Sequence, residues 1–293
     1  MGQQSIVGPT SHYFYSQRLK LHYVDWGNPT KPSLVLVHGG RDHARNWDWV
    51  AQALRGDFHV IAPDLRGHGD SQWALGSEYA MIEHVLDLAQ LLAQLDAFPV
   101  SLVGHSLGGA IVLQYAGVAP EGVARVAAIE GLGPPPEVIR RQKTSAHERM
   151  QDWIAQMRDF ARRQPRRYQS LAEAVSRMRQ ANARLTEAQA RHLTVHGTNR
   201  NEDGTHTWKF DNYVRAHSPY RFNVEDAWEI WGRIRCPTLL VRGTESWASD
   251  PTQDGRIKAF RQARAVTVAG AGHWVHHDRL EPFLRELKAF LEG

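Results

Sequence analysis

Residues 100–109 read Val-Ser-Leu-Val-Gly-His-Ser-Leu-Gly-Gly, and this stretch decides the fold. An apolar run over 100–103 predicts a strand, and a helix-like run over 110–119 follows a short turn centred on Ser106. A serine on so sharp a strand-to-helix turn takes strained backbone angles, so the residues two places away on either side must be very small. The turn holds the hydroxyl out of the sheet and directs the first helical amides toward the group that it attacks. Ser106 is therefore the candidate nucleophile.

Helix and strand patterns alternate along most of the chain. Residues 18–25 alternate as an outer strand. Short apolar runs predict strands covered on both faces at 33–38, 58–63, 100–104, 123–130, 237–242 and 265–269. Helical spacing appears at 47–54, 81–95, 110–119 and 280–291. This order predicts an α/β protein with a mostly parallel central sheet flanked by helices.

The alternation stops at Gly131-Leu-Gly-Pro-Pro-Pro136, and from there to Arg235 the chain is helical, basic and aromatic, with no convincing core strand. We predict one core made of residues 1–130 and 236–293, with 131–235 as an inserted helical cap, or lid. The insertion holds 19 Lys and Arg against 12 Asp and Glu. The arginine-rich stretch 162–167 is interpreted as a solvated helix face, because no nucleic-acid-binding motif accompanies it.

Composition indicates a soluble enzyme rather than a membrane or nucleic-acid-binding protein. The 293 residues carry a net charge of +4, residues 1–10 are polar, and no apolar run reaches the roughly 18 residues that span a bilayer. The single cysteine, Cys236, excludes an internal disulfide and is interpreted as a small buried hydrophobe. We expect a cytoplasmic monomer or homodimer that acts on a small molecule, with no nucleic-acid partner and no membrane insertion.

Four motifs together resemble the α/β-hydrolase superfamily. The stretch Val103-Gly-His-Ser-Leu-Gly-Gly109 resembles its nucleophile elbow, and Leu34-Val-Leu-Val-His-Gly-Gly40 is similar to its oxyanion loop. Asp64-Leu-Arg-Gly-His-Gly-Asp-Ser71 resembles the loop after the next strand, and Ala271-Gly-His273 resembles the catalytic-histidine loop. The middle segment is most similar to the serine hydrolase-like, lidded esterase subgroup. The resemblance implies an α/β-hydrolase fold with a helical lid inserted after the sixth strand.

A serine hydroxyl needs a base within hydrogen-bond reach, and His273 is the best of 16 histidines. It follows a glycine, comes just after the last predicted strand, and precedes an apolar helix. His276 and His277 lie where that helix begins and are weaker alternatives, while His38 and His68 are expected to organise loops. The sequence has neither a His-Glu-x-x-His motif nor a cysteine cluster, so we expect no metal and no cofactor.

The acid that orients the imidazole has more than one candidate. In most of the superfamily it follows the strand that corresponds to 238–242, but the usual aspartate position is here Ser246. Some members carry it one strand earlier, where this chain has Glu130. A carboxylate at the end of an apolar strand is costly to bury without a partner. We therefore predict Glu130 as the acid, with Glu245 and Asp250 as alternatives and a hinge role for Glu130 left open.

The resemblance places the two oxyanion-hole amides on Gly40 and Leu107. We further expect Arg41, His105 and Trp274 to contact the substrate. Haloalkane dehalogenases and epoxide hydrolases on this fold resemble one another in having an aspartate at the position of Ser106. A serine at that position favours acyl transfer instead. The sequence thus predicts a serine esterase acting on small to medium apolar carboxylic esters through an acyl-enzyme. A carbon–carbon bond hydrolase of a ring-cleavage pathway and a hydrolase-derived ligand receptor are the alternatives.

Overall fold

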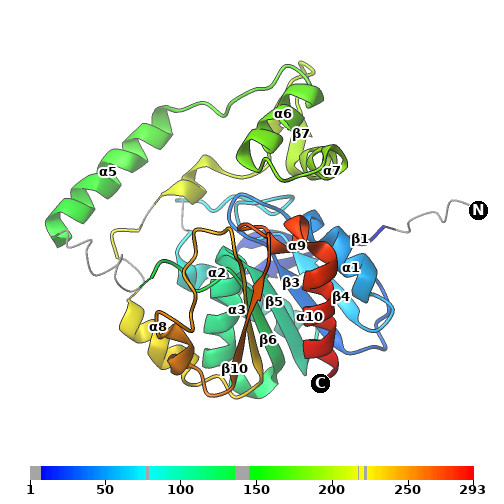
Figure 1. Cartoon of the computed structure of the whole chain (residues 1–293). Helices are drawn as coiled ribbons and strands as arrows, with labels where there is room; N and C mark the ends of the chain where they lie inside the picture. The colour runs from blue at the N-terminus through cyan, green and yellow to red at the C-terminus, as the bar shows by residue number, and fades with distance from the viewer. Residues whose placement is uncertain (1–7, 77–78, 136–144, 217, 221–222) are drawn as a thin grey trace, which may run out of the picture.

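The computed structural model describes residues 8–76, 79–135, 145–216, 218–220 and 223–293 (Figure 1). One sheet of eight strands runs through the body of the molecule in the order β1-β2-β4-β3-β5-β6-β9-β10. The strands are β1 (Thr10–Ser16), β2 (Leu19–Asp25), β3 (Ser33–Val37), β4 (His59–Pro63), β5 (Val100–His105), β6 (Val123–Ile129), β9 (Thr238–Gly243) and β10 (Ala263–Val268). The pairs from β4 to β10 are all parallel, and β1 and β2 join antiparallel at one edge. The predicted fold class is confirmed.

Helices cover both faces of the sheet (Figure 1). The body helices are α1 (Asp48–Leu54), α2 (Met81–Gln94), α3 (Leu107–Val118), α8 (Val224–Trp231), α9 (Val275–Asp278) and α10 (Leu280–Glu292). Neighbouring residues of β3 point to opposite faces. Val35 and Val37 belong to a buried cluster with residues of α2, α3 and α8, while Leu34 and Leu36 belong to a second cluster with residues of α1 and α10. Full burial on both faces explains why this strand reads as a continuous apolar run.

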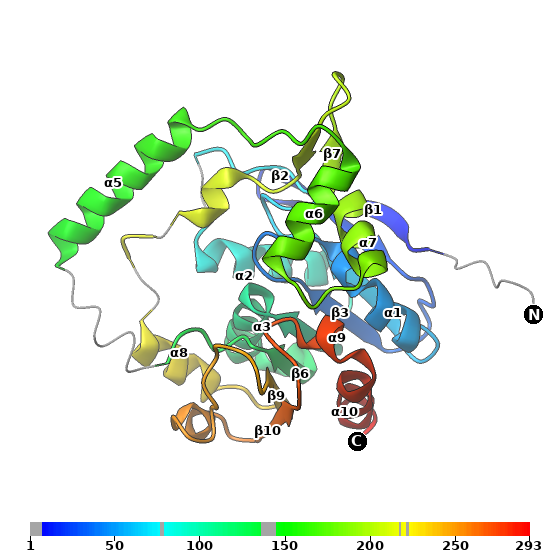
Figure 2. The same cartoon turned by 45° about the horizontal axis from the view of Figure 1, so that its top comes forward.

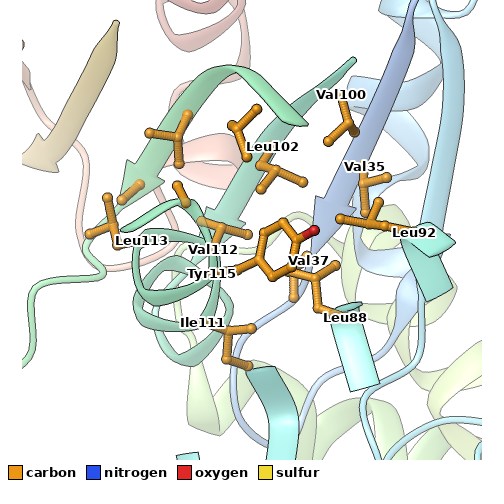
Figure 3. Close-up of a cluster of buried hydrophobic side chains, with 14 of the residues drawn as sticks. Val35, Val37, Leu88, Leu92, Val100, Leu102, Ile111, Val112, Leu113 and Tyr115 are labelled. Carbon is orange, nitrogen blue, oxygen red and sulfur yellow. The ribbon is translucent and has the colours of Figure 1, made fainter. Parts of the chain in front are cut away.

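The first of these clusters joins three elements around β5 (Figure 3). Leu102 of β5 lies among Val35 of β3, Leu88 of α2 and Val112 of α3, all of them buried. The cluster fixes α3 against the sheet directly below the turn that carries Ser106. Burying a side chain of this size contributes about 1.5–3 kcal/mol, so the turn rests on one of the most strongly packed parts of the body.

The N-terminal edge differs from the sequence prediction. Residues 18–25 were expected to form the outer strand, yet β2 is second and β1 forms the edge, with Thr10 opposite Asp25. In β1 only Phe14 and Ser16 are buried. A strand with one neighbour and few core contacts carries polar residues along most of its length, and that composition is also typical of a loop.

Between β6 and α8 the chain forms a layer over the body (Figures 1 and 2). Its elements are α5 (Ala146–Arg162), α6 (Leu171–Ala181), α7 (Glu187–Gly197), the short strands β7 (Thr198–Arg200) and β8 (His206–Trp208), and the 3-10 helix η3 (Asn212–Arg215). Helix α5 buries none of its residues. Within the described part of this segment no strand joins the main sheet. Residues 136–144, 217 and 221–222 of the predicted lid lie outside the described residues.

Polar contacts hold this layer on the body. The Asp211 amide donates to the Gly67 carbonyl at 2.8 Å, and Tyr79 Oη donates to Asp211 Oδ2 at 2.5 Å. On the other side, His43 Nε2 donates to the Leu193 carbonyl of α7 at 2.9 Å. Helix α8 is different, because its buried Ala227 and Trp231 belong to the first core cluster. It is therefore packed as part of the body, although the sequence prediction placed it in the insertion.

No helix in the described ranges is both long enough and apolar enough to cross a bilayer.

Candidate active site

Ser106 occupies the sharp turn between β5 and α3. Its backbone angles are φ 52° and ψ −115°, a region that residues with a Cβ rarely adopt. The Ser106 amide donates to the Ile129 carbonyl of β6 at 2.8 Å, which ties the turn to the neighbouring strand. The side chain is only half-buried, and the next residue begins α3. The strained turn therefore holds the hydroxyl at the end of the sheet, where the sequence predicted it.

Glycines are required around Ser106 because neighbouring backbone atoms leave no room for a side chain there. A Cβ on Gly104 would lie 2.2 Å from the Gly108 carbonyl oxygen, and a Cβ on Gly108 would lie 2.2 Å from the Val37 carbonyl oxygen. Both neighbours are backbone atoms of packed elements, so neither moves aside easily. The small residues of the motif thus allow α3 to start directly against β3 and β5.

His273 lies in the loop between β10 and α9. The loop is fastened to the elbow, because His105 Nε2 donates to the His273 carbonyl at 2.9 Å and the two imidazole rings lie 4.8 Å apart. The Gly272 amide donates to Asp278 Oδ2 at 2.8 Å, which closes the loop from the other side. In the described structure no hydrogen bond joins Ser106 Oγ to His273. Catalytic hydrogen bonds of this kind are often long before substrate binds.

Glu130 follows β6 directly and has a φ of 55°. Its buried carboxylate accepts hydrogen bonds from the Gly243 amide at 2.8 Å and from Ser246 Oγ at 2.6 Å. His273 Nδ1 lies 3.4 Å from Glu130 Oε2. The carboxylate thus faces the imidazole while two other donors fix its position, and Ser246, which stands at the usual aspartate position, is one of them.

The two alternative acids face elsewhere. Glu245 is exposed and pairs with Arg184. Asp250 accepts hydrogen bonds from the amide and hydroxyl of Thr252 and lies 3.6 Å from Arg242. Within the described residues neither carboxylate contacts His273.

The loop after β3 lies against the elbow. A Cβ on Gly39 would lie 3.2 Å from Ser106 Cβ, and one on Gly40 would lie 3.9 Å from Leu107 Cδ2. The Gly39–Gly40 backbone therefore lies next to Ser106 and to the side chain of Leu107. His38 donates through Nδ1 to the Gly39 carbonyl at 2.6 Å and accepts the Leu65 amide at Nε2, so it organises this loop.

Asp42 and Asn46 continue the same loop beneath the lid. Asn46 donates to the Asp42 carboxylate and accepts from His276 Nε2 at 2.7 Å. Burial raises the pKa of Asp42 to about 7, against the opposing effect of the His43 amide and of Asn46. His276 is buried, and burial holds its pKa well below the usual value. His276 of α9 is therefore an uncharged, buried residue that binds Asn46 of this loop.

A cavity of about 560 Å³ lies between the body and the layer that covers it. Gly40, Arg41 and Trp274 line it from the body. The layer supplies apolar and aromatic side chains, among them Phe160, Met178, Leu185, Trp208 and Phe210. Two of the three residues expected to contact substrate, Arg41 and Trp274, thus reach the cavity.

His105, the third, does not reach the cavity. It is 1 % exposed and packs against His273, and burial holds its pKa well below the usual value. It is the last residue of β5, a strand that is buried throughout. Its ring supports the His273 loop, and its contact with a substrate stays a prediction.

Among the described residues, two groups of side chains outside the cavity consist of residue types that can bind a metal ion. Asp48, His192 and His196 form one, and His22, Asp64 and Asp70 form the other. His192 Nε2 lies 3.0 Å from Asp48 Oδ2, and the Arg45 guanidinium also binds that carboxylate. The positive charge of Arg45 opposes a cation there, and the contacts explain the group as part of the attachment of α7 to α1.

Comparison with known proteins identifies the family. The family model described as alpha/beta hydrolase fold matches residues 32–280. A 3-hydroxybutyrate-oligomer hydrolase of Cupriavidus necator is 30 % identical over 274 residues, 87 % of each chain. Esterase YbfF of Escherichia coli is 26 % identical over 88 % of this chain and 92 % of its own. The chain belongs to the α/β-hydrolase superfamily.

Among solved structures, a thioesterase domain from the curacin biosynthetic pathway superposes with a TM-score of 0.82 and 24 % sequence identity. The match covers 96 % of this chain and 99 % of that domain. At this identity the likeness concerns the fold.

The close approach at the elbow gives a stability prediction. Gly108→Ala forces a Cβ against two carbonyl oxygens of the β3 end, so it should lower the free energy of unfolding by about 3 kcal/mol or more. Gly56→Ala is the control, because its Cβ would meet no atom within 4 Å, and it should change that free energy by less than about 1 kcal/mol. Urea unfolding followed by circular dichroism measures both. Equal effects of the two substitutions would contradict the close-packed elbow.

Proposed function

We propose that this protein is a serine hydrolase of carboxylic esters, with Ser106 as nucleophile, His273 as base and Glu130 as the acid that orients the base. The observation that carries the proposal is the convergence of a strained serine turn, a histidine loop bonded to that turn, and a buried carboxylate facing the histidine. The names of the relatives are consistent with it, since one is an esterase and another hydrolyses 3-hydroxybutyrate oligomers.

In the proposed reaction, Ser106 Oγ attacks the ester carbonyl carbon while its proton passes to His273 Nε2. The carbonyl oxygen becomes an oxyanion that the amides of Gly40 and Leu107 stabilise, an effect worth roughly 3 kcal/mol per donor. Collapse of the tetrahedral intermediate expels the alcohol, which takes the proton from His273 and leaves an acyl-serine. A water molecule then loses a proton to His273 and attacks the acyl carbon, which releases the carboxylic acid and restores Ser106.

Glu130 has two tasks in this scheme. It accepts a hydrogen bond from Nδ1–H of His273, which leaves Nε2 free to face Ser106, and its charge stabilises the imidazolium that forms during attack. The Gly243 amide and the Ser246 hydroxyl hold the buried carboxylate in place. Ser246 is therefore a proposed positioning residue.

The nucleophile is tested with Ser106→Ala. Because the attacking oxygen is lost, hydrolysis of 4-nitrophenyl butyrate should fall by about six orders of magnitude, and labelling by a fluorophosphonate should disappear. Ser176→Ala, at an exposed position on α6, is the control and should retain both. Mass spectrometry should place the adduct of the unmodified protein on the peptide that contains Ser106. An adduct on another peptide would refute the assignment.

The acid is tested with Glu130→Gln. The substitution keeps the shape but removes the charge that stabilises the imidazolium, so kcat should fall by about four orders of magnitude with a modest change in KM. Glu245→Gln is the matched control, because that carboxylate pairs with Arg184, and it should cost less than tenfold. Should Glu245→Gln abolish turnover while Glu130→Gln keeps it, the acid belongs after β9.

We also propose that the segment from residue 131 to about 216 is a lid that forms the substrate cavity, with α8 assigned to the body. Its attachment through polar contacts and the absence of buried residues in α5 support this. Limited proteolysis should then make its first internal cut in the lid, with the exposed β7–β8 hairpin around Arg200 as the preferred site. A first cut inside the strands of the main sheet would overturn the lid proposal.

A further inference from the structure

Positively charged side chains predominate among the described residues that line the cavity beneath the lid. Five arginines line it: Arg41 from the body, and Arg163, Arg166, Arg177 and Arg215 from the lid. Arg163 pairs with Asp159, and Arg166 lies 3.5 Å from Glu173. The other three, Arg41, Arg177 and Arg215, make no ion pair with any described residue. Asp42 is the one acidic residue among the described lining residues, and burial raises its pKa to about 7, so near neutral pH its carboxyl is only partly ionised and does not balance the five arginines.

The arginines lie close enough together for their charges to affect one another. The pKa of Arg215 is lowered, first by burial and then by the positive charges of Arg41, Arg163 and Arg177. Those residues come from three separate parts of the chain, so their mutual effect reflects convergence in the folded protein. The Arg215 guanidinium also lies 5.5 Å from the centre of the Phe210 ring. An aromatic ring under a guanidinium holds its plane in place and leaves the N–H groups at its edge available.

A neutral hydrogen-bonding group lines the same cavity. His277 is 6 % exposed, and neither of its ring nitrogens has a hydrogen-bond partner within the described structure. Burial lowers its pKa to about 3, so the ring is uncharged at neutral pH. Buried polar atoms without partners are rare in folded proteins, and one that lines a cavity points to a ligand as the missing partner.

The cavity also adjoins the proposed reaction centre. Gly40 belongs to its wall and lies next to the side chain of Leu107, the residue after Ser106, and Arg41 follows Gly40 directly with a φ of 63°. A non-glycine residue in that conformation is strained, and such strain is most often found at functional sites. A molecule bound with its ester at Ser106 would therefore place another part of itself among the arginines.

We propose that the ester or thioester substrate carries an oxyanion, a carboxylate or a phosphate, at the end remote from the scissile bond, and that Arg41, Arg177 and Arg215 bind it. The inference rests on the proposed ester hydrolysis and names its substrate class. It amends the sequence-based expectation of purely apolar esters. The lid residues Phe160, Met178 and Leu185 contact an apolar stem, and the arginines select the charged end by charge-assisted hydrogen bonds.

Matched substrate pairs test the charge requirement. Mono-4-nitrophenyl adipate is compared with its neutral methyl ester, which places the charge on the acyl side. S-butyryl-4′-phosphopantetheine is compared with S-butyryl-pantetheine, which places it on the leaving group. At least one anionic substrate should have a kcat/KM about tenfold or more above that of its neutral partner, mainly through KM. The pair that shows the preference identifies the side that carries the oxyanion.

Arginine substitutions locate the effect. Arg177→Gln and Arg215→Gln should each reduce the anionic-to-neutral ratio of kcat/KM by about tenfold, and Arg177→Lys should restore part of it. Arg233→Gln is the control, because Arg233 pairs with Glu229 outside the cavity, and it should leave the ratio unchanged. Equal losses for both members of a pair, or the same loss in the control, would overturn the proposal.

A binding measurement separates this inference from the proposed function. Calorimetry with Ser106→Ala should detect adipate binding that Arg215→Gln weakens, and dimethyl adipate should bind less tightly. If esters are hydrolysed without charge preference and adipate does not bind, the oxyanion site is refuted while the esterase stands. If adipate binds through the arginines but no ester is hydrolysed and Ser106 is not labelled, the esterase is refuted while the oxyanion site stands.

Discussion

The parallel pairing of β3, β5, β6 and β9 is the constraint on which the site depends. Val37 pairs with Gly104, His105 pairs with Ile129, and Ile129 pairs with Val241. With this register the carboxyl ends of the four strands stop at nearly the same level of the sheet. The residue after each strand therefore emerges at one edge, and residues far apart in the chain meet there without a long loop. A shift of one residue in any of these pairings would turn the following side chain to the other face.

Glu130 shows how closely the register and the chemistry are linked. Its amide donates to the Val241 carbonyl, so the backbone pairing of β6 with β9 continues one residue beyond the strand. Its carboxylate then receives the Gly243 amide and the Ser246 hydroxyl from the loop after β9. The loop after β9, where most of the superfamily carries its acid, here supplies two donors to the carboxylate that we propose as the acid.

The sequence predicted most of what depends on local pattern. The apolar runs of β3, β5 and β6 could be recognised because both faces of these strands are buried. Ser106 and His273 stand in short motifs, and their roles as nucleophile and base stay predictions. Edge strand β1 was missed, because exposure removes the alternation that would identify it. Ser246 was seen only as a departure from the usual aspartate. Its hydrogen bond to Glu130 depends on the pairing of β6 with β9, which no local pattern reveals.

The arginines of the cavity could not be predicted from the sequence for the same reason. Arg41, Arg177 and Arg215 lie on a body loop, on α6 and on η3, and each alone is an ordinary exposed arginine in a basic chain. Only the folded arrangement brings them to one wall. In the proposed function the body fixes the reacting groups with strained turns and buried hydrogen bonds, whereas the layer above it contributes charge and apolar side chains to the cavity. Hydrogen bonds such as those of His43 to Leu193 and of Tyr79 to Asp211 join the two parts, so the positions of Arg177 and Arg215 depend on the body as well as on their own elements.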